Sequence, residues 1–300
     1  MIKKIINSTF LLLVISVSSS VQAKLNVFAC EPEWAALAFE LGGDALHIYS
    51  ATTSQQDPHH IQARPSLIAK ARQADLLICT GAELETGWLP LLLRKAGNAQ
   101  IQPGKLGNFV AADYVDMHDV PEKLDRSMGD VHAEGNPHIH TNPENILLIA
   151  EQLKIRLSEL DSANSVLYSG NYLQFKKTWQ GLVTTWKKQT VLLRDVNVVT
   201  HHNYWNYLNV WLGLNVLATL EPISGVSPSS SYLAKVKQRL QTKKVKMIMH
   251  VSYASDRPAQ WLAAQIDVPV VALPSSVNYQ AGQTLEQWFT LLFTKLNDVP

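Results

Sequence analysis

Two patterns of hydrophobic and polar positions alternate along most of the chain. In the first half, strand-like apolar runs at Leu25–Cys30, Ala45–Ser50 and Leu76–Thr80 alternate with helical patterns at Pro32–Leu41, Leu67–Gln73 and Glu85–Lys95. In the second half, strand patterns at Asn197–Thr200, Val216–Thr219, Val245–Val251 and Val268–Leu273 alternate with helical patterns at Tyr204–Leu212, Ser229–Gln241, Pro258–Gln265 and Leu285–Leu296. Short strands separated by helices predict parallel sheets that helices cover on both faces.

One long helical pattern, at Ser162–Gln189, separates the two halves. Its apolar positions repeat in steps of three and four, at Tyr168, Tyr172, Phe175, Trp179, Leu182, Val183 and Trp186. They predict an amphipathic helix of about 42 Å. A coiled coil has the same spacing, but the chain offers no partner segment. We therefore predict an α/β fold of two small parallel-sheet lobes, residues 24–161 and 190–300, joined by one rigid helix at 162–189.

The first 23 residues have the pattern of a secretory signal. Lys3 and Lys4 precede an apolar run from Phe10 to Val17, and small residues lead to Ala23. The run is shorter than the roughly 18 residues that a membrane helix needs, and no later stretch reaches that length. A lysine, rather than the cysteine of a lipoprotein, follows Ala23. We predict cleavage after Ala23 and a soluble periplasmic protein.

The charge balance argues against polyanionic partners. The whole chain has a formal net charge of +1, and loss of two lysines and no acids with the signal peptide brings it to −1. We therefore expect neither nucleic acid nor an anionic membrane surface as a partner.

Two cysteines, Cys30 and Cys79, each end a short apolar run. An even number of cysteines in an oxidising compartment favours pairing. If the two runs are neighbouring parallel strands, their ends meet and the thiols can form a disulfide. Two buried free thiols are the alternative.

Histidines are concentrated in polar loops. The loops are Asp57-Pro58-His59-His60, the stretch DVHAEGNPHIHTNP with His138, and Thr200-His201-His202-Asn203. We expect each of the three to follow a strand. Asn142 and Pro143 have the pattern of a helix start directly after the second loop. Neutral imidazole is the commonest ligand of Zn²⁺ and suits other divalent metals. Because side chains two apart on an extended segment point to opposite sides, and adjacent histidines rarely share an ion, we expect one ligand per loop.

These segments resemble the zinc/manganese-type periplasmic solute-binding proteins of ABC importers, over nearly all of the mature chain. DPHHIQARPS resembles the family's Asp-Pro-His segment, with Pro65 six residues after the ligand His59. NPHIHTNP resembles its Asp-Pro-His-x-Trp-x-Asp-Pro segment and places a ligand at His138. THHNYWNYL resembles its His-Asp-Ala-Phe-Gly-Tyr segment, and the position of Tyr207 selects His202. ADLLICTGAELE and LEPISGVSPSSSYL resemble further family segments.

The resemblance implies two α/β lobes joined by a long helix, with the metal in the cleft between them. It also implies a monomeric binding protein, not an enzyme, that delivers a divalent metal to an inner-membrane ABC transporter permease. Three histidine ligands are more similar to the zinc branch than to the manganese branch. We therefore expect Zn²⁺ as the transported ligand and Mn²⁺ less so.

The chain departs from the family around the fourth ligand. Ser275 and Ser276 lie where many members carry an aspartate, and His250 lies where relatives often have glutamate. The sequence leaves a water, a carboxylate from elsewhere and His250 as alternatives. The long histidine-rich insertion of some zinc members is absent, and only the run with His118, His132 and His140 can act as a capture arm. Solvated loop histidines are the alternative reading of that run.

Two other classes of function share some of these features. Three histidines and a water are also a catalytic zinc arrangement, as in a secreted hydrolase. However, the chain has no HExxH motif and no acid beside the histidine motifs as an obvious general base. An exported binder of haem or a metal chelate needs an aromatic pocket, but tryptophans such as Trp179 and Trp186 occupy helix-spaced core positions. A metal-binding transport component is the best interpretation.

Overall fold

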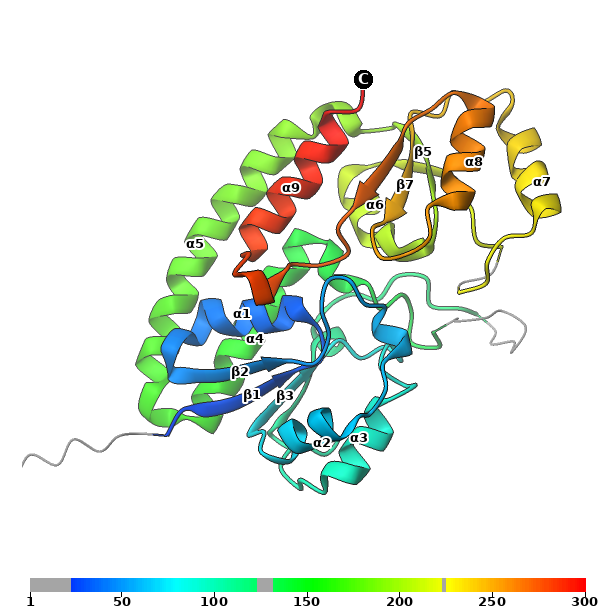
Figure 1. Cartoon of the computed structure of the whole chain (residues 1–300). Helices are drawn as coiled ribbons and strands as arrows, with labels where there is room; N and C mark the ends of the chain where they lie inside the picture. The colour runs from blue at the N-terminus through cyan, green and yellow to red at the C-terminus, as the bar shows by residue number, and fades with distance from the viewer. Residues whose placement is uncertain (1–22, 123–131, 223–224) are drawn as a thin grey trace, which may run out of the picture.

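The protein contains two parallel four-stranded sheets, one in each half of the chain (Figure 1). The computed structural model describes residues 23–122, 132–222 and 225–300, so the predicted signal peptide lies almost wholly outside the described residues. The first sheet has the order β2-β1-β3-β4, with β1 (Leu25–Ala29), β2 (Leu46–Ser50), β3 (Leu76–Cys79) and β4 (Asn108–Val110). The second has the order β6-β5-β7-β8, with β5 (Asn197–Thr200), β6 (Asn215–Thr219), β7 (Met247–Val251) and β8 (Val270–Leu273). The predicted α/β fold is confirmed.

Helices cover both sheets. They are α1 (Pro32–Gly42), α2 (Pro65–Arg72), α3 (Leu89–Ala96) and α4 (Pro143–Leu160) in the first half, and α6 (Asn206–Leu212), α7 (Ser230–Leu240), α8 (Arg257–Ile266) and α9 (Leu285–Asn297) in the second. Helix α4 begins as predicted, because Oδ1 of Asn142 accepts the Glu144 backbone N–H at 2.8 Å. No helix in the described ranges is both long and apolar enough to cross a membrane.

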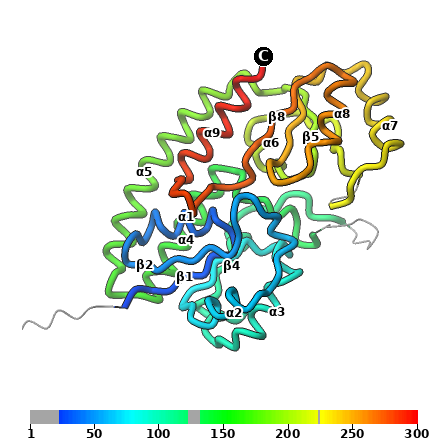
Figure 2. The backbone as a smooth tube through the Cα atoms, viewed as in Figure 1, coloured from blue at the N-terminus to red at the C-terminus, as the bar shows by residue number. Residues whose placement is uncertain are grey.

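The long helix α5 (Ser165–Gln189) joins the two halves, as predicted. It begins three residues later than expected because Ser162–Asn164 forms a 3-10 turn. Helix α5 packs against α1 and α4 of the first half and against α9, the C-terminal helix (Figures 1 and 2). Its aromatic stripe is buried, although Leu182 and Val183 are only half-buried. A central apolar core runs continuously from the first sheet through α5 and α9 to the second.

Two boundaries of the first lobe differ from the sequence expectation. Helix α3 begins at Leu89 and not at Glu85, because the preceding residues form turns and Trp88, with φ −141° and ψ −35°, lies outside helical geometry. Strand β4 has three residues, too few to show an alternating pattern, and the sequence did not reveal it.

The predicted disulfide between Cys30 and Cys79 is present. Strands β1 and β3 are parallel neighbours, with Ala29 opposite Ile78, and the Cys30 N–H donates to the Ile78 carbonyl at 2.8 Å. The two thiols therefore meet at the carboxyl ends of adjacent strands. Because both cysteines of the chain are in this bond, neither sulfur is available as a thiolate ligand.

Candidate metal centre

The three predicted ligands come together from three separate segments. His59 lies in the 3-10 turn Pro58–His60 that follows β2, and His202 lies two residues after β5. His138 directly precedes the turn Ile139–Thr141 and helix α4, so it does not follow a strand as the sequence suggested. The ring centroid of His138 is 5.8 Å from that of His59 and 5.7 Å from that of His202.

Two carboxylates orient the outer histidines. Nδ1 of His59 lies 2.7 Å from Oδ1 of Asp57, and Nδ1 of His202 lies 2.7 Å from Oε2 of Glu221. Histidine ligands of metals commonly donate their second ring nitrogen to a carboxylate in this way. When Nδ1 donates a hydrogen bond to the carboxylate, the lone pair of the neutral tautomer is on Nε2. Each ring can therefore offer Nε2 to a metal ion.

Hydrogen bonding keeps both carboxylates charged. Burial raises the pKa of Asp57, but the hydrogen bonds and charge of His59 outweigh burial and hold that pKa below its ordinary value. The pKa of Glu221 is lowered in the same manner against burial, by His202 and by the backbone N–H of Gly225. An ionised carboxylate strengthens the basicity of the imidazole that it holds.

Strand pairing places Glu221 beside His202. Thr200 of β5 pairs with Thr219 of β6, and the Glu221 N–H donates to the His201 carbonyl at 3.0 Å. His202 and Glu221 each lie two residues beyond these paired strand ends. The sequence analysis missed this carboxylate, although two adjacent parallel strands ending in a histidine and an acid were a usable signal.

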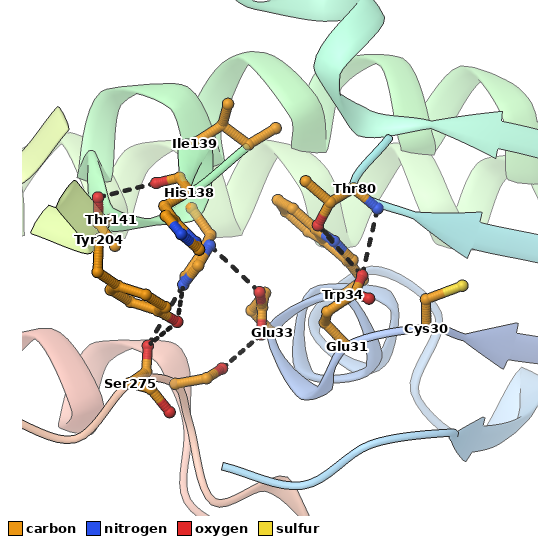
Figure 3. A network of polar contacts seen from close by, with 12 residues as sticks. Cys30, Glu31, Glu33, Trp34, Thr80, His138, Ile139, Thr141, Tyr204 and Ser275 are labelled. Carbon is orange, nitrogen blue, oxygen red and sulfur yellow. Dashed lines mark hydrogen bonds and ion pairs between the residues drawn. The ribbon is translucent and has the colours of Figure 1, made fainter. Parts of the chain in front are cut away.

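His138 is the most deeply buried of the three, with 1% of its surface exposed. The backbone N–H of His138 donates to Asn136 Oδ1. The ring of Tyr204 stacks on the His138 ring with centroids 3.9 Å apart, and the His138 carbonyl accepts from the Thr141 hydroxyl (Figure 3). Burial, reinforced by repulsion from His202 and His59, lowers the pKa of His138 well below its ordinary value, so its imidazole is neutral. Within the described residues its Nδ1 has no hydrogen-bond partner.

The three rings are slightly farther apart than in a metal complex. Two imidazoles on one tetrahedral zinc ion have centroids roughly 5 Å apart, given Zn–N bonds of about 2.0–2.1 Å. Among the described histidine, cysteine, aspartate and glutamate residues, the one group already close enough to share a metal is Cys30, Cys79 and Glu85, and its cysteines form the disulfide. Coordination by the histidines therefore requires the rings to turn or move inward. A cavity of about 120 Å³ lies between Asp57 and His59 on one side and His202 and Glu221 on the other.

Two of the remaining histidines have structural partners. The His118 ring stacks on Tyr207 at 4.2 Å, and its Nδ1 lies 2.9 Å from Asn206 Oδ1. His140 is buried, with Nε2 3.1 Å from the Tyr204 hydroxyl and Nδ1 3.3 Å from Glu33 Oε1. Because Ile139–Thr141 is a 3-10 turn and not the extended segment assumed from the sequence, the rings of His138 and His140 do not point to opposite sides but lie edge to face, with centroids 6.3 Å apart.

Around the fourth-ligand position, Ser275 and Ser276 are hydrogen-bonded to other groups, whereas neither ring nitrogen of His250 has a hydrogen-bond partner among the described residues. Ser275 Oγ donates to the Ser54 carbonyl and Ser276 Oγ donates to Glu33 Oε2. In Figure 3 Ser275 also lies beside Tyr204, whose hydroxyl donates to the Ser275 carbonyl at 3.0 Å. His250 is buried and its ring lies 5.0 Å from that of His201.

One histidine of the suggested capture arm does lie at the centre. The ring of His132 is 5.2 Å from that of His59, and their Nε2 atoms are 3.2 Å apart. The sequence analysis grouped His132 with His118 and His140, and nothing in that grouping distinguished it.

Two parallel-sheet lobes, a long connecting helix and histidines contributed by both lobes are the features of a periplasmic metal-binding protein. The family model for ZnuA, the periplasmic component A of zinc-uptake complexes, matches residues 27–298. The chain therefore belongs to the ZnuA family, whose members are the metal-binding components of ABC importers and not enzymes. The family resemblance found in the sequence motifs is confirmed.

Curated relatives are similar over most of their length. The metal ABC transporter substrate-binding lipoprotein ScbA of Streptococcus cristatus is 24% identical over 252 residues, which are 83% of this chain and 79% of the relative. The manganese ABC transporter substrate-binding lipoprotein PsaA of Streptococcus pneumoniae is 23% identical over 251 residues, with the same two shares.

Solved structures show the same fold. A crystal structure of ZnuA superposes with a TM-score of 0.74 at 19% identity and covers 92% of this chain and 99% of that one. The Mn-bound periplasmic metal-binding protein of Candidatus Liberibacter asiaticus has a TM-score of 0.74 at 21% identity, with the same coverage.

Proposed function

We propose that this protein binds Zn²⁺ between its lobes in the periplasm and delivers it to the inner-membrane permease of an ABC importer. His59, His138 and His202 are the principal ligands. The observation that carries the proposal is one neutral, buried imidazole between two imidazoles whose Nδ1 atoms are held by carboxylates at 2.7 Å. A bound ion would satisfy ring nitrogens in a region where unpaired polar atoms are costly.

The donor set favours zinc over manganese. Imidazole suits Zn²⁺, whereas Mn²⁺ prefers carboxylate, carbonyl and water oxygens. The nearby acids, Asp57 and Glu221, are engaged with Nδ1 of the histidines that they orient. Ser275 and Ser276 supply no carboxylate in the last loop. Mn²⁺ is therefore the less favoured cargo, although named relatives of this chain include manganese transporters.

The architecture supports ion binding between two lobes that move little. His59 and His138 belong to the first lobe, residues 24–161, and His202 belongs to the second, residues 190–300. The link, residues 162–189, is part of a continuous apolar core, which favours small adjustments over wide opening. We also propose that the protein is exported with cleavage after Ala23 and that it acts as a monomer.

Substitution of the ligands tests this function. We expect His59→Ala, His138→Ala and His202→Ala each to weaken zinc binding by orders of magnitude in competition titrations with a chromophoric chelator. His60→Ala is the matched control, because His60 is exposed and adjacent to a ligand, and we expect it to bind nearly normally. Elemental analysis of protein purified from the periplasm without chelator should find zinc.

Two results would contradict the proposal. Stoichiometric manganese in the purified protein would reject zinc as the cargo. A larger loss of affinity in His60→Ala than in His59→Ala would reject the ligand assignment.

A further inference from the structure

We propose that His132 is a fourth ligand of the same ion, so that four imidazoles hold the cargo. The inference rests on the proposed function, because it completes the site that His59, His138 and His202 form. It assigns the open fourth position to a residue of the first lobe and not to the last loop of the chain.

The distance between His59 and His132 matches coordination to one ion. Two nitrogens bound to tetrahedral zinc through bonds of about 2.0–2.1 Å are about 3.3–3.4 Å apart. The Nε2 atoms of His59 and His132 are 3.2 Å apart and the ring centroids 5.2 Å apart. The His138 centroid distances, 5.8 Å to His59 and 5.7 Å to His202, are longer. This pair is thus the closest to the coordinated arrangement among the measured pairs of the centre.

The hydrogen bond between Asp57 and His59 determines how the contact between His59 and His132 must change on metal binding. Asp57 accepts from Nδ1 of His59, so in the neutral tautomer the lone pair is on Nε2, the atom 3.2 Å from Nε2 of His132. With both rings neutral and no metal bound, His132 donates its Nε2–H to His59. An ion placed between the two rings needs the lone pair of both Nε2 atoms. The proton of His132 moves from Nε2 to Nδ1, and the ring stays neutral.

Backbone contacts hold His132 near His59. The N–H of Ala133 donates to Oε2 of Glu83 at 2.5 Å, and the His132 carbonyl accepts from the Gly135 N–H at 3.2 Å. Gly135 has a φ of +106°, and a Cβ there would lie 2.7 Å from the His118 carbonyl oxygen. Only glycine, which has no Cβ, lets the backbone at this position approach the His118 carbonyl so closely.

A four-imidazole site strengthens the preference for zinc. A carboxylate at the fourth position would offer the oxygen donor that Mn²⁺ prefers, whereas a fourth imidazole removes it. Ser275 and Ser276 supply no carboxylate, and their hydroxyls donate to Ser54 and Glu33, while the ring of His250 contacts that of His201.

Nitrogen NMR of the full mature protein labelled with ¹⁵N-histidine tests the proposal. Long-range ¹H–¹⁵N spectra report the tautomer and the metal-bound nitrogen of each ring. We expect zinc to shift one ring nitrogen in each of four histidines in the wild type and of three in His132→Ala. Zinc affinity of His132→Ala should fall at least about 10-fold, the lower range seen for loss of outer-shell partners of metal ligands. His60→Ala should keep both properties, and His132→Asp should lower the preference for Zn²⁺ over Mn²⁺.

The outcomes separate this inference from the proposed function. Unchanged zinc affinity and unchanged nitrogen shifts in His132→Ala, with loss of binding in His138→Ala, overturn the role of His132 alone. Unchanged zinc binding in His138→Ala overturns the proposed function itself. Melting of each metal-free variant identifies any loss that comes from misfolding.

Discussion

The carboxylate of Glu221 should control zinc affinity although it is not a ligand in the proposed site. We expect Glu221→Gln to weaken zinc binding because glutamine keeps the size of the side chain but removes its charge. The carboxylate lies 2.7 Å from Nδ1 of His202 and accepts a second hydrogen bond from the Gly225 N–H at 2.9 Å. Without the charge, the His202 ring loses its preferred tautomer and part of its basicity.

The expected magnitude follows from the geometry. His202 and Glu221 are both largely shielded, with 17% and 15% of their side-chain surfaces exposed, so water screens their hydrogen bond only partly. A charge-assisted bond of this length is of the strong kind. Loss of such outer partners typically costs about 10–100-fold in metal affinity, or about 1.4–2.7 kcal/mol. We expect Glu221→Gln to fall in this range.

A double-mutant cycle is the decisive assay. Zinc affinity is measured by chelator competition for the wild type, Glu221→Gln, His202→Ala and the double variant. If Glu221 acts only through His202, the Glu221 substitution has no further effect in the His202→Ala background. Glu144→Gln is the control, because Glu144 forms an exposed ion pair with Lys187 on helices α4 and α5. An equal loss in both backgrounds, or an equal loss in Glu144→Gln, would refute the reasoning.

Two further predictions concern stability. Replacing Cys30 and Cys79 with serine should lower the free energy of unfolding by about 4 kcal/mol, because the disulfide closes a loop with a sequence separation of 49; urea denaturation with an unchanged midpoint would contradict this. Burial raises the pKa of Glu85 from its ordinary value of 4.5 to about 7, so between these two pH values the folded state binds more protons than the unfolded state. Below about pH 4.5 Glu85 is protonated in both states and does not lower the free energy of unfolding. As pH rises through 7, ionisation of the buried carboxyl lowers the free energy of unfolding by up to about 3 kcal/mol. Glu85→Gln should therefore flatten the decline in stability between pH 5 and 8, and an identical decline in both proteins would disprove the assignment.

Local patterns were sufficient to predict the layered fold. The period of apolar residues along a segment reports which face it buries, and that information lies within a few residues. The helix start at Asn142 and the helix between the lobes were predictable for this reason. The three-residue strand β4 was not, because it is too short to show a period and exists through its pairing with β3. The start of α3 was also mispredicted, since the residues before it form turns and Trp88 is not helical.

Part of the candidate site was likewise predictable from local sequence, and part was not. The resemblance of three short motifs to family segments was sufficient to nominate His59, His138 and His202, because each motif fixes the ligand by its spacing to neighbouring residues. Nothing local distinguishes His118, His132 and His140, which have the same chemistry in neighbouring parts of one segment. Tertiary contacts decide their roles: His118 stacks on Tyr207, His140 bonds to Tyr204, and His132 meets a ring 73 residues away in sequence. Such contacts depend on how whole lobes pack, and no short stretch of sequence contains that information.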